Sequence, residues 1–304
     1  NFATATNSYN TAVGSAAGGA VTTGVFNTLM GALAGDALTD ADYNIAIGGN
    51  VLSTDTLGSR STAIGHGTLF AQNFTTATDT YNTAVGYNAG SAVTTGLGNT
   101  LTGGLAGDAL TDADYNTVFG YNALSSDTLG SRSTAIGIAA LFTQNLTTAT
   151  DSHNTAVGNL AGYAVTTGIK NTLLGSRSGD ALTDADSNVA IGESALSSDT
   201  LGSKSVAIGD SALYAQNFTT ATDAYNVAIG YAAGNAITTG QFNVAVGGRA
   251  LDASTTAWSN TAIGDRTLST DTRGQGSTAV GYRALTTQNF TTATDVYNVA
   301  VGFN

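Results

Sequence analysis

A five-residue motif recurs along the whole chain in lightly varied form, for example Asn82-Thr83-Ala84-Val85-Gly86. Successive closing glycines are 17, 17, 17 and 21 residues apart, and this cycle then restarts. The closing glycines are Gly14, Gly31, Gly48, Gly65, Gly86, Gly103, Gly120, Gly137, Gly158, Gly175, Gly192, Gly209, Gly230, Gly247, Gly264, Gly281 and Gly302. A fixed period of this length predicts a stack of similar coils, in which each coil buries its apolar surface only against its neighbours.

One cycle defines a super-repeat of 72 residues. No copy differs enough to be a second domain, so one repetitive domain is predicted over residues 1–304. The copies span about 10–81, 82–153, 154–225 and 226–297, and a fifth begins at Asn298. Residues 1–6 match residues 73–78 inside a later repeat, so we expect an excerpt of a longer fibre.

The motif alternates with period two, which is typical of a β-strand. Thr83 and Val85 point to one face, and Asn82, Ala84 and Gly86 point to the other. The second and fourth motif positions are nearly always Thr, Val or Ile, and we interpret this β-branched face as packed. The fold class predicted is all-β, a parallel β-solenoid of about 17 coils with 17 or 21 residues each. No helical spacing is sustained, so no helix is predicted.

Each coil is expected to hold two short strands. The second strand follows the glycine and ends in Ala-Leu or Ala-Gly, as at Ala123-Leu124 and Ala89-Gly90, with turns such as Leu57-Gly58-Ser59 between strands. The four extra residues of the long coil always fall in the same place, which predicts a recurring protruding loop. These loops are Ala71–Asp79, Thr143–Asp151, Ala215–Asp223 and Thr287–Asp295.

Stacking places equivalent residues about 4.8 Å apart. The first motif position then becomes an asparagine ladder whose amides bond to neighbouring coils, with serine in the long coils at Ser61, Ser133, Ser205 and Ser277. The glycine at the strand end predicts a sharp corner or a close backbone approach. Large core residues are scarce, so we expect a further buried face covered by other copies of the chain.

Composition excludes several classes of protein. The chain has no Cys and no Pro, and its formal net charge is −12. Absent cysteine excludes disulfide and thiolate sites, and an acidic balance disfavours nucleic acid as a partner. No apolar run approaches the ~20 residues of a membrane span, and no signal peptide is visible. Absent proline fits strands that are paired on both edges.

The motif resembles the head repeat of trimeric autotransporter adhesins, the YadA-like head, in Asn188-Val189-Ala190-Ile191-Gly192 and in residues 205–209. The resemblance covers nearly the whole chain. It implies a left-handed parallel β-roll, three chains in one rod carried on a stalk and membrane anchor, and binding to host matrix proteins or cells. The turns at residues 22–24 and 238–240 are also similar to repeats of phage tail fibres and microbial surface fibres.

No catalytic, cofactor-binding or metal site is predicted, and no cofactor. His66 and His153 are the only histidines, and they occupy unrelated positions in their coils. A catalytic triad or a zinc site needs histidine together with cysteine or clustered carboxylates. We therefore interpret both histidines as surface residues and the chain as no enzyme.

The recurring aspartates are interpreted as turn and N–H caps. Asp-x-Asp also supplies oxygen ligands for Ca²⁺, so calcium binding stays an alternative, for which calcium should raise the melting temperature. These aspartates are Asp36, Asp40 and Asp42 with Asp108, Asp112, Asp114, Asp180, Asp184 and Asp186, then Asp55, Asp127, Asp199 and Asp271, and Asp79, Asp151, Asp223 and Asp295.

Three further surface features have competing interpretations. Regular threonines suggest ice binding, but Thr11 and Thr28 exchange with Ile45 and Val189, which favours a packed face. The position before the motif is aromatic or basic. Its side chains either cover strand backbones or form a site for glycans or proteins. It holds Tyr9, Phe26, Tyr43, Tyr81, Tyr115, Tyr225, Phe242 and Tyr297, alternating with Arg60, Arg132, Lys170 and Lys204. Formal N-glycosylation acceptors lie on the long loops at Asn73, Asn145, Asn217 and Asn289.

Together these features predict an extracellular fibre or adhesin shaft that mediates surface attachment. The expected partners are two further copies of the chain or fibre self-assembly, with a host-surface protein or glycan as the ligand. Its expected place is a cell surface, as an outer-membrane-anchored fibre, or a virion fibre. The alternative is a structural filament or phage tail-fibre segment without a receptor site of its own.

Overall fold

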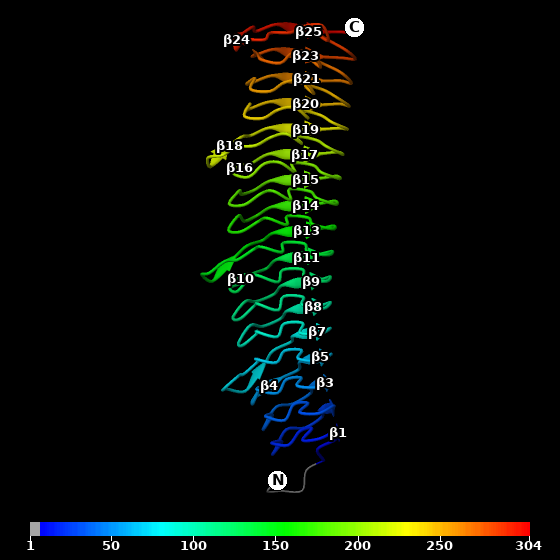
Figure 1. Ribbon diagram of the computed structural model, residues 1–304, viewed down its shortest axis with the longest axis vertical. Helices are drawn as coiled ribbons and strands as arrows, with labels where there is room; N and C mark the ends of the chain where they lie inside the picture. Colours follow the sequence, from blue (N-terminus) through cyan, green and yellow to red (C-terminus); the bar gives the residue numbers. More distant parts are fainter. Residues whose placement is uncertain (1–6) are drawn as a thin grey trace. The chain divides into compact units, whose positions relative to one another are not determined.

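The computed structural model describes residues 7–304, in two compact units, residues 7–153 and 154–304 (Figure 1). Each unit is a series of stacked coils without α-helix, so the predicted all-β parallel solenoid is confirmed. The unit boundary coincides with the end of the second super-repeat. The predicted sequence match of residues 1–6 with residues 73–78 lies outside the described residues.

The first unit stacks its three-residue strands in parallel, one per coil. Equivalent motif positions face each other, for example Thr83 opposite Thr100 and Val85 opposite Thr102. The strands are β1 (Thr11–Val13), β2 (Thr28–Met30), β3 (Ile45–Ile47), β5 (Thr62–Ile64), β7 (Thr83–Val85), β8 (Thr100–Thr102), β9 (Thr117–Phe119) and β11 (Thr134–Ile136).

The second unit repeats this arrangement in the same register. Val189 lies opposite Val206, and Ile191 lies opposite Ile208. Its strands are β13 (Thr155–Val157), β14 (Thr172–Leu174), β15 (Val189–Ile191), β17 (Val206–Ile208), β19 (Val227–Ile229), β20 (Val244–Val246), β21 (Thr261–Ile263), β23 (Thr278–Val280) and β25 (Val299–Val301).

Among residues 7–304 a second strand forms only beside the long coils, which corrects the prediction of two strands in every coil. Residues 57–59, predicted as a turn, contain β4. The segments ending in Ala-Leu or Ala-Gly are turns, because backbone φ is positive at alternate residues, as at Leu33 (57°) and Gly35 (56°). The parallel two-residue pairs are β4 (Gly58–Ser59) with β6 (Thr78–Asp79), β10 (Gly130–Ser131) with β12 (Thr150–Asp151), β16 (Gly202–Ser203) with β18 (Thr222–Asp223), and β22 (Gly274–Gln275) with β24 (Thr294–Asp295).

The interior of each coil is filled by small residues and leucine. Ala84, at the third motif position, is fully buried, and so are Leu101 and Leu110 in the next coil. The β-branched residues Thr83 and Val85 are only half-buried, on the outer face of the strand. The prediction that this face is packed is therefore wrong for the single chain: the coil is too narrow for β-branched side chains opposite leucine.

The asparagine ladder is present and buried. Asn27 donates from its backbone N–H to Asn10 Oδ1 (2.8 Å) and from its side-chain Nδ2 to the carbonyl of Ala41 (2.7 Å). Its own Oδ1 accepts from the backbone N–H of Asn44 (2.9 Å). Each rung therefore bonds to the rungs on both sides and also closes the corner of its own layer.

The closing glycines are required by backbone geometry. Gly175 has φ of 136°, and a Cβ there would meet the carbonyl oxygen of Gly192 in the next coil. This is the predicted sharp corner with close backbone approach.

Replacing one rung of the ladder should destabilise the second unit. Asn171 makes three hydrogen bonds, with Asn154 Oδ1 (2.9 Å) and the Asn188 N–H (3.0 Å) of the neighbouring rungs and with the Ala185 carbonyl (2.7 Å). Asn171→Ala leaves buried partners unpaired and is expected to cost about 2–4 kcal/mol of unfolding free energy, measured by urea denaturation. Asn159→Ala, at an exposed site in the preceding coil, is the control and should change little. Equal effects of the two substitutions would contradict the ladder's role.

Candidate functional site

The long coils project loops from the solenoid, as predicted, and these are visible beside β10 and β18 in Figure 1. In the first loop Thr75, Thr76 and Ala77 are exposed, whereas Phe74 is 6% exposed and packs inward. The loop therefore has an apolar anchor and a polar tip.

A buried polar cluster holds each loop in place. Asp55 Oδ1 accepts from the N–H groups of Gly58 (3.1 Å) and Phe74 (3.0 Å), and its Oδ2 accepts from Gln72 Nε2 (2.6 Å). Gln72 Nε2 also donates to Ser61 Oγ (2.9 Å). The predicted capping role of this aspartate is confirmed, and it extends from its own turn to the loop of the next coil.

Gln72 also bridges the asparagine ladder where the long coil interrupts it. Its Oε1 accepts from Asn82 Nδ2 (3.0 Å), while Ser61 replaces the asparagine of that rung. The shorter serine leaves space for the glutamine amide. Sequence reasoning noted the serines but missed the glutamines; the signal was their own 72-residue recurrence. Equivalent Asp–Gln–Ser groups are Asp127, Gln144 and Ser133, Asp199, Gln216 and Ser205, and Asp271, Gln288 and Ser277.

The aromatic and basic positions before the motif form exposed stacks at one corner. Phe26 and Tyr43 stack with ring centroids 5.0 Å apart, and the Arg60 guanidinium lies 4.8 Å from the Tyr43 ring centroid. Arg60 also pairs with Asp79 of the loop, Nε to Oδ1 at 2.9 Å. The cations of this corner thus tie down the loops, and the rings cover one another's faces.

Loop pairing recurs in the second unit, where Lys204 Nζ lies 2.6 Å from Asp223 Oδ2 and 3.2 Å from the Tyr225 hydroxyl. These two groups raise the pKa of Lys204. The pair is exposed, so it contributes little to stability.

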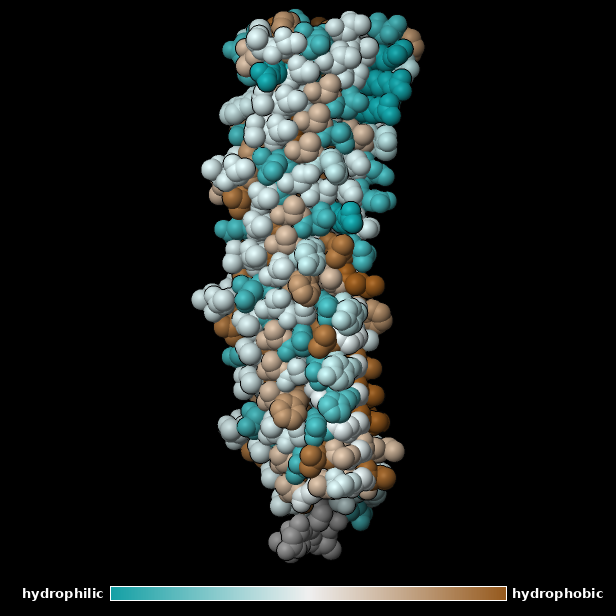
Figure 2. Space-filling view, viewed as in Figure 1, coloured by the Kyte–Doolittle hydropathy of each residue, from teal (hydrophilic) through white to brown (hydrophobic). Residues whose placement is uncertain are grey.

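The outer faces of the three-residue strands, which we call the long strands, carry an uncharged, largely apolar surface. Ile64 is 36% exposed and Phe119 is 59% exposed. Every outward position from β1 to β11 and from β13 to β25 holds Thr, Val, Ile, Leu, Met or Phe. Figure 2 shows apolar side chains recurring along the edge of the view where β3, β5 and β7 lie. Met30 and Phe119 interrupt the threonines, so the face is no regular threonine lattice of the kind ice binding needs.

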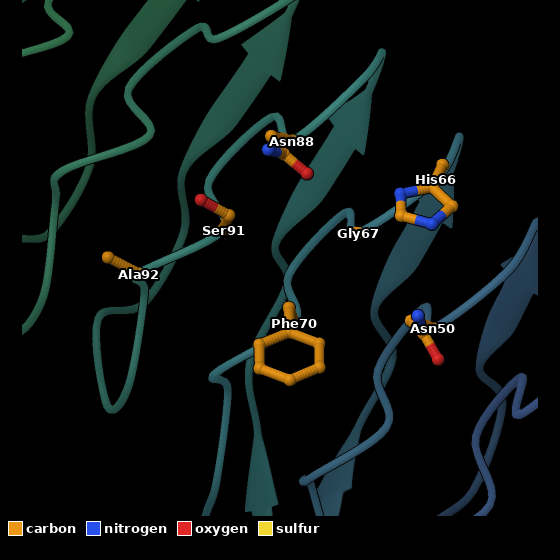
Figure 3. Close-up of a pocket in the computed structure, with 7 residues that line it drawn as sticks. All are labelled: Asn50, His66, Gly67, Phe70, Asn88, Ser91 and Ala92. Carbon is orange, nitrogen blue, oxygen red and sulfur yellow. The ribbon is translucent and has the colours of Figure 1, made fainter.

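A hollow of about 320 Å³ lies on the first unit, beside the turns that follow β5 and β7. Phe70 is exposed at its centre, with Asn50 and His66 on one side and Asn88 and Ser91 on the other (Figure 3). His66 also stacks on Tyr87, with ring centroids 5.9 Å apart. Sequence reasoning treated His66 as an isolated surface residue and did not find this site, because its residues come from three successive coils.

The Asp-x-Asp residues are used in inter-coil bonds. Asp42 Oδ1 accepts from the Val25 N–H (2.8 Å), and Asp40 Oδ1 accepts from Thr23 Oγ1 (2.5 Å). The capping interpretation is confirmed for these residues. Among residues 7–304, no three His, Cys, Asp or Glu side chains converge as a metal site would need.

The remaining predicted sites are dispersed. His153 lies exposed at the end of the first unit, away from the residues of the hollow. The glycosylation acceptors are exposed on the loops, and Asn145 Oδ1 accepts from Thr128 Oγ1 (3.2 Å). Residues 7–304 contain no helix long and apolar enough to cross a membrane.

Comparison with known proteins gave no relatives: no model of a known protein family matches the chain, and no curated protein is significantly similar in sequence.

Removing a loop anchor should expose the loop to proteolysis. Asp199 holds Gly202, Gln216 and Phe218, so Asp199→Ala leaves buried donors unpaired. Each costs about 1–3 kcal/mol, and we expect chymotryptic cleavage after Phe218 to accelerate roughly tenfold or more. Mass spectrometry of the fragments identifies the cut. Asp210→Ala removes the same charge from an exposed site and should leave the rate unchanged; an equal acceleration there would refute the anchoring role.

A second set of aspartates makes stability depend on pH. Burial raises the pKa of Asp180, and its Oδ1 is buried without a hydrogen-bond partner among the described residues. The folded-state pKa exceeds the unfolded one, so the charged carboxylate penalises folding at neutral pH, and this penalty disappears as pH falls below about 3.8. Asp108 and Asp252 have the same features.

We therefore expect Asp180→Asn to raise the melting temperature at pH 7, with the gain shrinking towards pH 3.5. Circular dichroism at a series of pH values measures both. Asp184→Asn is the control, since Asp184 Oδ1 already accepts from Thr167 Oγ1 (2.6 Å) and no gain is expected. A loss of stability in Asp180→Asn at pH 7 would contradict the prediction, because favourable interactions of the charged carboxylate would then outweigh the penalty of burying it.

Proposed function

We propose that the chain is a segment of an extracellular fibre or adhesin shaft, without enzymatic activity, that mediates surface attachment. It is carried on a cell surface, as an outer-membrane-anchored fibre, or on a virion. In this proposal three copies of the chain associate through the outer faces of their long strands.

The observation that carries the proposal is the uncovered apolar face of those strands. A contiguous apolar surface of this kind usually marks an interaction site. The interior of this solenoid holds few large side chains. Covering the outer face therefore adds hydrophobic burial that the narrow coil lacks.

Copies of the same chain are the occupant that fits this face best. The face repeats at the coil spacing, so a partner must present the same spacing to pack along its length. A second copy does so by construction, and closed symmetry is the usual form of self-association. The acidic residues lie outside these outward positions, so the net charge of −12 does not oppose contact there.

Surface attachment is supported by repetition. The loops recur every 72 residues and, in each unit, expose threonine-rich tips such as Thr75 and Thr76 or Thr219 and Thr220. Weak contacts made by many identical loops add up through avidity. The alternative is a structural filament or tail-fibre segment without a receptor site. Three of the four corner cations, Arg60, Arg132 and Lys204, are already paired with loop aspartates, which favours this alternative.

Sedimentation tests self-association. We expect a mass about three times 30.2 kDa for the chain. Ile191 and Ile208 face outward on neighbouring strands, so the double variant Ile191→Asp/Ile208→Asp buries charge in the interface and should yield monomers with unchanged circular dichroism. Thr219→Asp/Thr220→Asp adds the same charge to an exposed loop and should stay assembled. A monomeric parent chain would refute the trimeric assembly.

The same preparations separate the two functional classes. An adhesin segment should adhere to immobilised cells or matrix proteins, and the monomeric variant should adhere less through lost avidity. Assembly without adhesion would favour the structural filament.

A further inference from the structure

The hollow beside Phe70 is a candidate ligand site. The ligand that we infer for it rests on the proposed function of surface attachment and makes that function more specific. Its volume of about 320 Å³ is at the lower end of the roughly 300–1,000 Å³ typical of small-molecule sites. It lies within the first unit and is lined by Asn50, His66, Gly67, Phe70, Asn88, Ser91 and Ala92.

The absence of a side chain at Gly67 lets the Asn88 amide lie beside the hollow. Gly67 has φ of 65°, but the backbone does not require glycine there. The equivalent Ala139, Ser211 and Arg283 adopt φ of 53°, 56° and 59° with side chains present. At Gly67 the amide of Asn88 lies where a Cβ would otherwise be. The open space is thus a local departure from the repeat.

Two uncommitted amides face this space. Within residues 7–304 the side chains of Asn50 and Asn88 make no hydrogen bond, although both are half-buried. Each offers two N–H donors and one carbonyl acceptor. The Ser91 hydroxyl adds a further polar group, since its bond to the Asp108 carbonyl is long at 3.4 Å. Side-chain donors and acceptors without partners beside a hollow suit a ligand rich in hydroxyl groups.

An exposed aromatic ring completes the site. Phe70 is 45% exposed, and in Figure 3 its ring lies below Asn88 and beside Asn50. The face of an aromatic ring carries partial negative charge, which attracts the polarised C–H groups of a pyranose ring. A flat apolar platform flanked by amides and a hydroxyl matches a sugar, which has one apolar face and hydroxyl groups around its edge.

Charge selects the kind of sugar. The lining contains no Lys, Arg, Asp or Glu, and His66 is its one titratable residue. Acidic sugars need a cationic partner, and the chain's net charge of −12 repels them. We propose that this hollow binds one neutral hexopyranose residue of a surface glycan.

The other super-repeats lack this combination at the equivalent positions. Asn88 corresponds to Leu160 in the third copy and Ala232 in the fourth, and Gly67 corresponds to Ala139 in the second and Ser211 in the third. Those replacements occur in coils of the same fold with the same backbone conformation. They provide substitutions at the hollow that the coil is known to accommodate.

Saturation-transfer NMR on the full chain tests the site, with the methyl glycosides of glucose, galactose, mannose and N-acetylglucosamine as probes. We expect at least one to bind, with transfer concentrated on the C–H groups of one sugar face. Phe70→Ala, Gly67→Ala and Asn88→Leu should each reduce the signal fivefold or more. Asn122→Ser, which removes an amide at the position equivalent to Asn50, is the control and should retain it.

The outcomes are decisive in both directions. Binding by none of the four glycosides, or equal binding in Phe70→Ala and the parent chain, would overturn the proposal. Circular dichroism confirms that each variant is folded. Sedimentation keeps the sugar site separate from the proposed function: a trimer without glycoside binding defeats only the sugar site, and a monomer that binds glycoside defeats only the assembly.

Discussion

The structure depends on the exchange of hydrogen bonds between successive coils. The strands have only three residues, so each coil obtains its backbone partners from its neighbours. The buried asparagine side chain strengthens this exchange, because Asn99 binds the coil before it through Asn82 and the corner of its own layer through Ala113. A single coil lacks the rungs before and after it, so folding of one coil requires its neighbours.

The 21-residue coils show how this constraint tolerates an insertion. The extra residues leave the solenoid as a loop, and the register of the long strands on both sides is unchanged, as between β5 and β7. The insertion interrupts the ladder, because Ser61 stands where most rungs have asparagine. Gln72 restores the connection from the loop side, and the carboxylate of Asp55 fixes Gln72 in turn. A loop and its buried Asp–Gln–Ser anchor therefore recur together in the sequence.

The proposed function uses only what the coil leaves outside. The interior is filled by alanine and leucine, whereas the outer strand face, the loop tips and the corner turns vary without disturbing the ladder. The proposed roles match this division. In the proposal the apolar strand face serves self-association, and the sugar site lies beside Gly67, where one turn position has no side chain. Surface chemistry changes at such sites at little cost to the fold.

The sequence alone determined the parallel solenoid, the coil boundaries, the asparagine ladder and the loops, because a repeat of 72 residues with a fixed glycine leaves few other arrangements. Tertiary structure decided which face of the strand is interior: alternation assigns Thr83 and Val85 to one side, but only the narrow coil, filled by Ala84 and leucine, shows that this side is the outer one. Tertiary structure also decided that Gln72 joins the ladder and that Asn50, Phe70 and Asn88 meet around one hollow. These contacts join residues about 10 to 20 positions apart, and side-chain length and free space set them rather than any local pattern.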